Sequence, residues 1–192
     1  MTLAWHFTRL DCRLGYGDGR LVVAGETLTH DGPVKLCSSG LHASVSLLDA
    51  LGHASGPYLW RVKCSGEVIK GDDKLVCTER TAIAGFDASE MLRDFARRCA
   101  LDVVNLWDAP DVVIRYLKTG DKSIRAAARA AAWDAAWDAA WDAAWDAAWD
   151  AARDAARDAA RAAAWDAAWD AARLKQRRRL AAMAHARLRG LA

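Results

Sequence analysis

The sequence predicts an α+β protein with a small, mostly β N-terminal domain, then short helices, then a long alanine-rich helix. Three observations predict this architecture. Residues 1–85 contain short apolar runs separated by turns with glycine and proline. Residues 86–120 contain capping residues and apolar stripes, so we expect a connector of two helices. Residues 121–190 repeat every four residues and are mainly alanine, the strongest helix former.

The β-rich part is expected to hold several short strands. Tyr58–Cys64 alternates apolar and polar side chains, as a half-buried strand does. Shorter apolar runs bounded by turns are the other expected strands, at residues 21–23, 34–37, 66–69 and 74–78. Leu41–Leu51 is expected to be a short helix with Ser44 as its cap, and Pro57 prevents its continuation.

Two helices are expected in the connector. Asp87 and Glu90 have the three-residue spacing of a capping box, which marks the start of the first helix. An early proline and an acidic first turn at Asp108–Asp111 mark the start of the second helix. Gly120 is expected to end it.

The repeat helix, expected from a cap at Asp121 or Ser123 toward Gly190, carries a four-residue row that never loses its phase. Four residues exceed the 3.6 of an α-helical turn, so the row advances by about 40° per repeat. Tryptophans then gather on one broad side of the helix and most arginines on the other. The expected interface consists of seven tryptophans of this row: Trp133, Trp137, Trp141, Trp145, Trp149, Trp165 and Trp169.

Three interpretations of the repeat helix are open. A solvated single helix would be supported by pairs such as Asp150–Arg153. A packed assembly would bury the large apolar surface that the tryptophans make. Nucleic-acid binding by tryptophan stacking ranks last, because the aspartate after almost every tryptophan would repel phosphate. We favour self-association, giving a homo-oligomer, or docking onto the N-terminal domain.

The charge and the cysteine content limit which partners and which cellular compartment we expect. The net charge of +2 divides into −1 for residues 1–120 and +3 for residues 121–192. We expect the basic C-terminal end to be a solvated helix end rather than a contact to nucleic acid. Five cysteines without a CxxC pair or a secretory signal indicate reduced thiols in the cytoplasm of a bacterial host cell. An aspartate every four residues excludes the repeat from a membrane.

His42 is the best catalytic candidate, because it follows a glycine, Gly40, and lies where a turn is expected to lead into a helix. No nucleophile, base and orienting group accompany it, and a choice of acid between Glu67 and Glu79 is arbitrary, so we expect no enzyme. A zinc site would need His42 and Cys37, whose spacing is not that of a standard zinc motif, with one of Cys12, Cys64 and Cys77. We therefore expect neither a metal nor a cofactor.

The segment Gly15–Arg20 is a further candidate for binding a nucleotide-like ligand. Its glycines let backbone N–H groups approach an anion, and Tyr16 could stack on a base. The segment lacks the lysine and the strand–helix setting of a P-loop, so a flexible hairpin loop is the competing interpretation. Tyr16, Arg20 and His42 are the expected binding residues.

The motif VKLCSSGLHA at residues 34–43, followed by Ser65-Gly66-Glu67 and by GDDK at residues 71–74, resembles a domain-of-unknown-function family. That family is scattered through phage and bacterial genomes, and phage members, especially from actinobacterial hosts, often carry similar Ala/Trp/Asp/Arg tails. The resemblance covers roughly residues 5–80. It implies a phage or prophage origin and no known catalytic residues. The Gly-x-His-Ala segment also resembles the NAD-binding half of ADP-ribosyltransferase folds.

These observations lead to one expected function and two alternatives. We expect a non-enzymatic, phage-type binding protein that assembles or docks through its tryptophan helix. In the first alternative, an anti-defence protein sequesters a nucleotide-derived immune signal of the host. In the second, the chain is a degenerate ADP-ribosyltransferase-like enzyme. The expected partners are a second copy of the chain, a small nucleotide-like ligand or a host protein.

Overall fold

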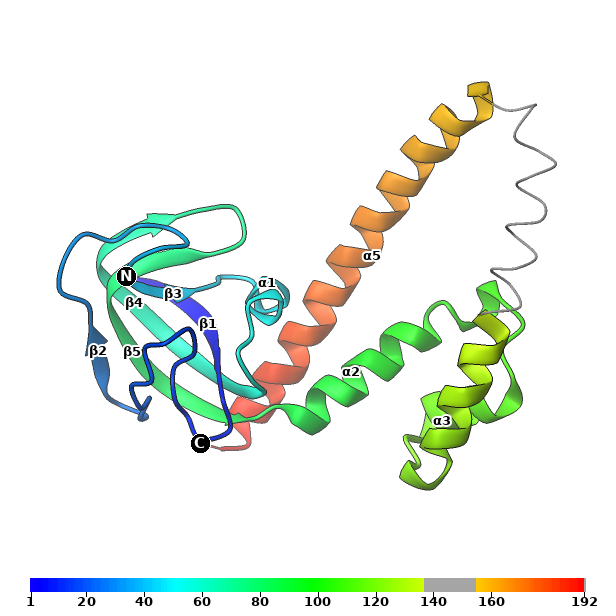
Figure 1. Cartoon of the computed structure of the whole chain (residues 1–192), viewed down its shortest axis with the longest axis horizontal. Helices are drawn as coiled ribbons and strands as arrows, with labels where there is room; N and C mark the ends of the chain where they lie inside the picture. The colour runs from blue at the N-terminus through cyan, green and yellow to red at the C-terminus, as the bar shows by residue number, and fades with distance from the viewer. Residues whose placement is uncertain (137–154, 192) are drawn as a thin grey trace. The chain divides into compact units, whose positions relative to one another are not determined.

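The computed structural model describes residues 1–136 and 155–191, with side chains described outside residues 155–167 (Figure 1). The expected α+β class is confirmed, with an antiparallel sheet followed by short helices and a C-terminal helix. The chain divides into two compact units. One joins Met1–Leu92 to Lys175–Ala192, and the other consists of Arg93–Leu174. The sequence boundaries after residues 85 and 120 remain predictions.

Five antiparallel strands form the sheet of the first unit (Figure 1). The path runs β1-β4-β5-β2, and β3 also pairs with β5. The strands are β1 (Thr2–Thr8), β2 (Thr27–Thr29), β3 (Leu41–Ala43), β4 (Tyr58–Lys70) and β5 (Leu75–Asp87). Both β4 and β5 have 13 residues, and their hairpin is the backbone on which the shorter strands are added.

The hairpin joins segments that the sequence analysis treats as separate strands. Residues 58–64 and 66–69 are both in β4, because a register shift between Ser65 and Val68 lets the strand bend without ending. Gly66 has a φ of +70° there, a conformation that favours glycine. Residues 74–78 begin the second hairpin strand, β5, which continues to Asp87.

Three other expectations for this part of the chain are wrong. Residues 21–23 and 34–37 form no strand and contain only isolated bridges, Leu21 with Arg13 and Lys35 with Ser39. Their apolar character reflects the burial of Val22 and Val34. Residues 41–51 are not one helix, because the first three form β3. The helix α1 (Leu47–Gly52) begins later, where the Ser46 side chain accepts a hydrogen bond from the backbone N–H of Asp49.

The helices of the connector follow the expected capping residues. The Asp87 carboxylate accepts a hydrogen bond from the Ser89 backbone N–H at 2.9 Å, at the start of α2 (Ser89–Leu101). The helix α3 (Asp111–Thr119) begins after Pro110. Gly120 ends it in the left-handed conformation, with a φ of +68°. A short 3₁₀ helix at Val104–Leu106 lies between them and was not expected.

The repeat segment begins at the expected cap. Asp121 accepts a hydrogen bond from the Ser123 backbone N–H at 2.9 Å, and the 3₁₀ helix Lys122–Ile124 leads into helical residues 125–136. The described part resumes with α5 (Ala155–Arg189). The expected continuity of one helix through residues 137–154 lies outside the described residues.

The basic C-terminal end of α5 packs on the sheet domain with one face, whereas most of its basic side chains are exposed, so the expectation of a solvated end holds only for the outer face of the helix. Leu180 and Ala184, one helical turn apart, are 0% exposed. Arg177 donates a hydrogen bond to the carboxylate of Asp49 in α1 at 2.9 Å, and that carboxylate is largely buried. The ring of His185 lies 5.2 Å from the ring of Trp5 in β1. An apolar stripe therefore underlies the basic sequence.

Leu180→Ala tests this packing. Removing a fully buried leucine side chain leaves a cavity, so the free energy of unfolding should fall by about 3 kcal/mol. Leu174→Ala, on the same helix but 48% exposed in the wild type, is the matched control and should change it by less than about 1 kcal/mol. Urea denaturation followed by circular dichroism measures both. Equal effects of the two substitutions would contradict the docked arrangement.

Candidate functional site

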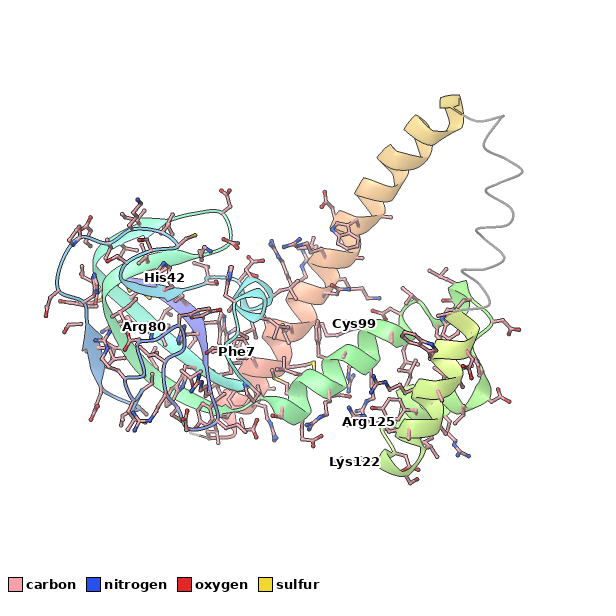
Figure 2. The ribbon with its side chains drawn as sticks, in the orientation of Figure 1. Phe7, His42, Arg80, Cys99, Lys122 and Arg125 are labelled. Atoms are coloured by element: carbon pink, nitrogen blue, oxygen red, sulfur yellow. The ribbon has the colours of Figure 1, made fainter. Side chains whose placement is uncertain are left out.

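One cavity of about 620 Å³ lies within the sheet domain. Residues of β1, of the loop 14–20, of residues 37–44, of the α1 region and of β5 line it. Figure 2 labels three residues of this lining, Phe7, His42 and Arg80, all within the sheet domain. Segments far apart in the sequence therefore meet around one space.

Arg80 of β5 is the buried charge of this site. The residue is 3% exposed, and its Nη1 donates a hydrogen bond to the backbone carbonyl of His42. Its Nη2 is also buried and has no hydrogen-bond partner among the residues that the structure describes. Burial lowers the pKa of the guanidinium to about 10, so the group is still positively charged at neutral pH.

The His42 ring is held by the backbone of the turn that precedes it. The Cys37 backbone N–H donates to its Nε2 at 3.1 Å, and a further hydrogen bond joins the ring to the backbone of Gly40. Burial lowers the pKa of His42, so its imidazole is neutral at physiological pH. The ring holds the turn at Cys37–Gly40, where Cys37 has a φ of +62°.

His6 of β1 lies beside these two residues. Burial, followed by the nearby charge of Arg80, lowers its pKa well below the ordinary value, and a hydrogen bond to the His42 backbone opposes this. The imidazole is therefore neutral. Its Nε2 is buried and has no hydrogen-bond partner among the described residues. With the other ring nitrogen bonded to the His42 backbone, this Nε2 is a hydrogen-bond acceptor.

Tyr16 and Arg20, the binding residues expected from the glycine-rich loop, also line the cavity. Arg20 forms two hydrogen bonds with the Asp18 carboxylate, at 2.7 and 2.8 Å, and these lower the pKa of Asp18. Tyr16 is 88% exposed, and its hydroxyl donates to the His53 carbonyl at 3.2 Å. The structure thus brings Tyr16, Arg20 and His42 to one cavity, and their binding role remains a prediction.

The remaining lining adds charge and a histidine–aspartate pair. His53 Nε2 lies 2.7 Å from an oxygen of Asp73. A hydrogen bond to the Cys37 side chain raises the pKa of the lining residue Lys74. Among the lining residues, Arg20, Lys74 and Arg80 are cationic and Asp18 alone is a carboxylate. The cavity therefore has an excess of positive charge.

The sequence analysis missed Arg80 and His6 as site residues. An inward position in a strand is usually apolar, and Arg80 occupies such a position in β5. That departure from the alternating pattern was the available signal. Glu67 and Glu79, the acids considered there, do not line the cavity, and Glu79 accepts a hydrogen bond from the Ser65 hydroxyl at 2.9 Å.

The zinc arrangement considered above has no counterpart in the described part of the chain. There, no three His, Cys, Asp or Glu side chains are grouped so that they could hold a metal ion. The contact between Cys37 and His42 runs through a backbone N–H and not through the thiol. Cys64 and Cys77 are buried on the neighbouring strands β4 and β5.

Two of the seven interface tryptophans have described side chains. Trp133 is 70% exposed and Trp169 is 61% exposed. Trp137, Trp141, Trp145 and Trp149 lie outside the described residues, as does the side chain of Trp165. Assembly through these residues remains a prediction.

Comparison with known proteins gives one match. Residues 10–94, less than half of the chain, match the family model of a domain of unknown function (DUF7666). This range contains most of the residues that line the cavity. No curated protein and no solved structure matches the chain. Within the described residues, no helix is both long and apolar enough to span a membrane.

The buried His6 predicts that acid destabilises the fold. The unfolded chain takes up a proton at His6 near pH 6.5, whereas the folded protein does so only at lower pH. Between these values the unfolded state binds more protons, so the free energy of unfolding decreases as the pH falls below about 6.5. His6 contributes up to about 1.4 kcal/mol per pH unit. His42 and His185, whose pKa values are also lowered, act in the same direction.

Urea titrations between pH 7.5 and pH 5 measure this dependence. His6→Phe removes the titrating group, so its free energy of unfolding should fall less steeply with acid than that of the wild type. An unchanged slope in this variant would show that His6 is not held neutral by the fold.

Proposed function

We propose that the N-terminal domain is a non-catalytic binding module that holds a small polar ligand in its cavity. The cavity itself carries this proposal. Its volume of about 620 Å³ is typical of small-molecule sites, which usually combine an apolar lining with a few polar groups. Trp5, Phe7 and Leu41 supply apolar lining, and Arg80 and four neutral or hydrogen-bonded histidines lie among them.

The hydrogen bond between the His42 ring and the backbone favours a binding function over a catalytic one. General acid–base chemistry needs a ring nitrogen within reach of the substrate, and Nε2 of His42 already accepts a hydrogen bond from the Cys37 backbone N–H. The glutamates that an ADP-ribosyltransferase-like reaction could use lie outside the lining. An enzyme is therefore the less favoured alternative.

We further propose that the chain is a phage-type protein of the host cytoplasm, and that its ligand is a nucleotide-derived signal that it sequesters. The motif at residues 34–43 supports the first part through its resemblance to phage domains. The positive excess and the size of the cavity support the second, because a nucleotide is anionic and fits such a volume.

Assembly through the repeat helix is the second candidate function. Trp133 and Trp169 expose large apolar rings, which soluble proteins usually bury in an interface. Self-association would place several copies of the binding module together. The two functions are compatible, because the cavity lies in the sheet domain and the tryptophans lie in the repeat.

A blocked cavity tests the binding proposal. Ser38 is an exposed residue of the lining, so Ser38→Trp should fill the mouth without disturbing the core. A ligand that binds the native state raises the melting temperature, and Ser38→Trp should abolish this shift. The screen covers nucleosides, nucleotides, cyclic dinucleotides and ADP-ribose.

Lys35→Trp is the matched control, since Lys35 is exposed on the same loop and outside the lining. It should keep the wild-type shift. A panel without any stabilising compound would contradict the binding proposal. Turnover of NAD that is abolished by His42→Ala would contradict the non-catalytic assignment.

Light scattering at high concentration tests assembly. The purified chain should have a mass above that of a monomer, because burial of the tryptophan rings favours association. Replacing Trp137, Trp141 and Trp145 by Ala should lower the mass, and so should the pair Trp133→Ala and Trp169→Ala. Leu174→Ala, which removes an exposed apolar side chain outside the tryptophan row, is the control. A monodisperse wild-type monomer would refute the interface.

A further inference from the structure

Two buried polar atoms in the cavity lining have no partner among the described residues. One is Arg80 Nη2, a hydrogen-bond donor, and the other is His6 Nε2, an acceptor. Both side chains are bonded to the backbone of His42, which brings them to the same place in the lining. The charge of Arg80 also contributes to the lowered pKa of His6, as expected for neighbouring groups.

Unsatisfied polar atoms in a folded interior cost free energy, and buried charges are usually paired. A ligand that bonds to both atoms would recover this cost. It must offer an acceptor oxygen to Arg80 and a hydroxyl or N–H donor to His6. The complement of this pair is therefore a ligand with an acceptor and a donor close together.

The charge of the lining shows which kind of acceptor fits. Asp18 is the one carboxylate of the lining; it forms two hydrogen bonds with Arg20, and its charge also acts on Arg80. Three lining cations, Arg20, Lys74 and Arg80, therefore face one lining carboxylate. A phosphate carries up to two negative charges and several acceptor oxygens, and guanidinium groups bind it well. A neutral acceptor would leave the positive excess of the lining uncompensated.

We propose that Arg80 and His6 form a seat for a phosphorylated polyol, such as the sugar phosphate of a nucleotide. Both atoms have almost no accessible surface in this structure, so binding requires a shift of the two side chains that opens them to the cavity. A phosphate oxygen then accepts from Arg80 Nη2, and a neighbouring hydroxyl donates to His6 Nε2. Lys74 adds the second positive charge from the lining. This inference rests on the proposed binding function and names the part of the ligand that the buried atoms recognise.

Three small probes separate the contributions of phosphate and hydroxyl. Ribose 5-phosphate carries both groups, ribose carries only hydroxyls, and propyl phosphate carries only the phosphate. Isothermal titration of the full chain should show the tightest binding for ribose 5-phosphate, with each other probe roughly tenfold or more weaker. Equal binding of ribose would overturn the seat, and so would an absence of ribose 5-phosphate binding at millimolar concentration.

Variants of Arg80 and His6 test whether these two residues cause the binding of ribose 5-phosphate. Arg80→Met keeps a long side chain and should weaken ribose 5-phosphate binding by roughly tenfold to hundredfold. His6→Phe should remove the advantage of ribose 5-phosphate over propyl phosphate. Arg13→Met, at an exposed arginine outside the lining, is the control and should bind like the wild type.

The outcomes distinguish the seat from the broader proposal. If the nucleotide panel yields a ligand whose binding depends on neither phosphate nor Arg80, the seat is wrong and the binding module stands. If Ser38→Trp and the wild type both bind nothing in the panel, the binding module itself is wrong. Should Arg80→Met fail to fold, the three probes on the wild-type chain still decide the question.

Discussion

The hydrogen bond from the buried guanidinium of Arg80 to the carbonyl of His42 is the interaction around which the sheet domain is organised. A cation that is 3% exposed requires acceptors inside the protein, because water is not there to solvate it. The His42 carbonyl lies in β3, which pairs with β5, the strand that carries Arg80. The His42 ring in turn holds the turn at Cys37–Gly40, and His6 of β1 bonds to the same backbone. One charge therefore links three strands and a loop around the cavity.

The C-terminal end of α5 contacts residues that line the cavity or lie beside it. Trp5 lines the cavity, and its ring also contacts His185 of α5 and lies 4.5 Å from the Arg61 guanidinium. In α1, Asp49 pairs with Arg177, and the adjacent Ala50 lines the cavity. The C-terminal end of α5, which is more than 120 residues from α1 in the sequence, thus packs against both β1 and α1 beside the cavity. The sheet domain as matched at residues 10–94 is incomplete without it.

Local signals predicted those parts of the fold that depend on local physics. Asp87 and Gly120 mark helix ends because a side-chain acceptor and a left-handed residue are needed at such positions whatever the surroundings. The strand predicted for residues 21–23 is wrong because an apolar run indicates burial. Only the arrangement of the whole domain decides whether a buried segment becomes a strand of a sheet. In the site, glycines drew attention to Tyr16 and His42. Arg80 was missed because most arginines are exposed, although its place in the apolar phase of β5 was a signal that it is enclosed.

The four-residue row of the repeat ends where docking begins, and this explains why the end of α5 behaves differently from the rest. Arg177 is the last member of the row, and it is the residue that pairs with the buried carboxylate of Asp49. Beyond it, Leu180 and Ala184 follow at the three- and four-residue spacing that keeps one face of a helix against one surface. A row that rolls around the axis by about 40° per repeat cannot do this over several turns. The change of period therefore separates the repeat, in which the row is predicted to roll around the axis, from a segment whose apolar spacing suits packing on one domain.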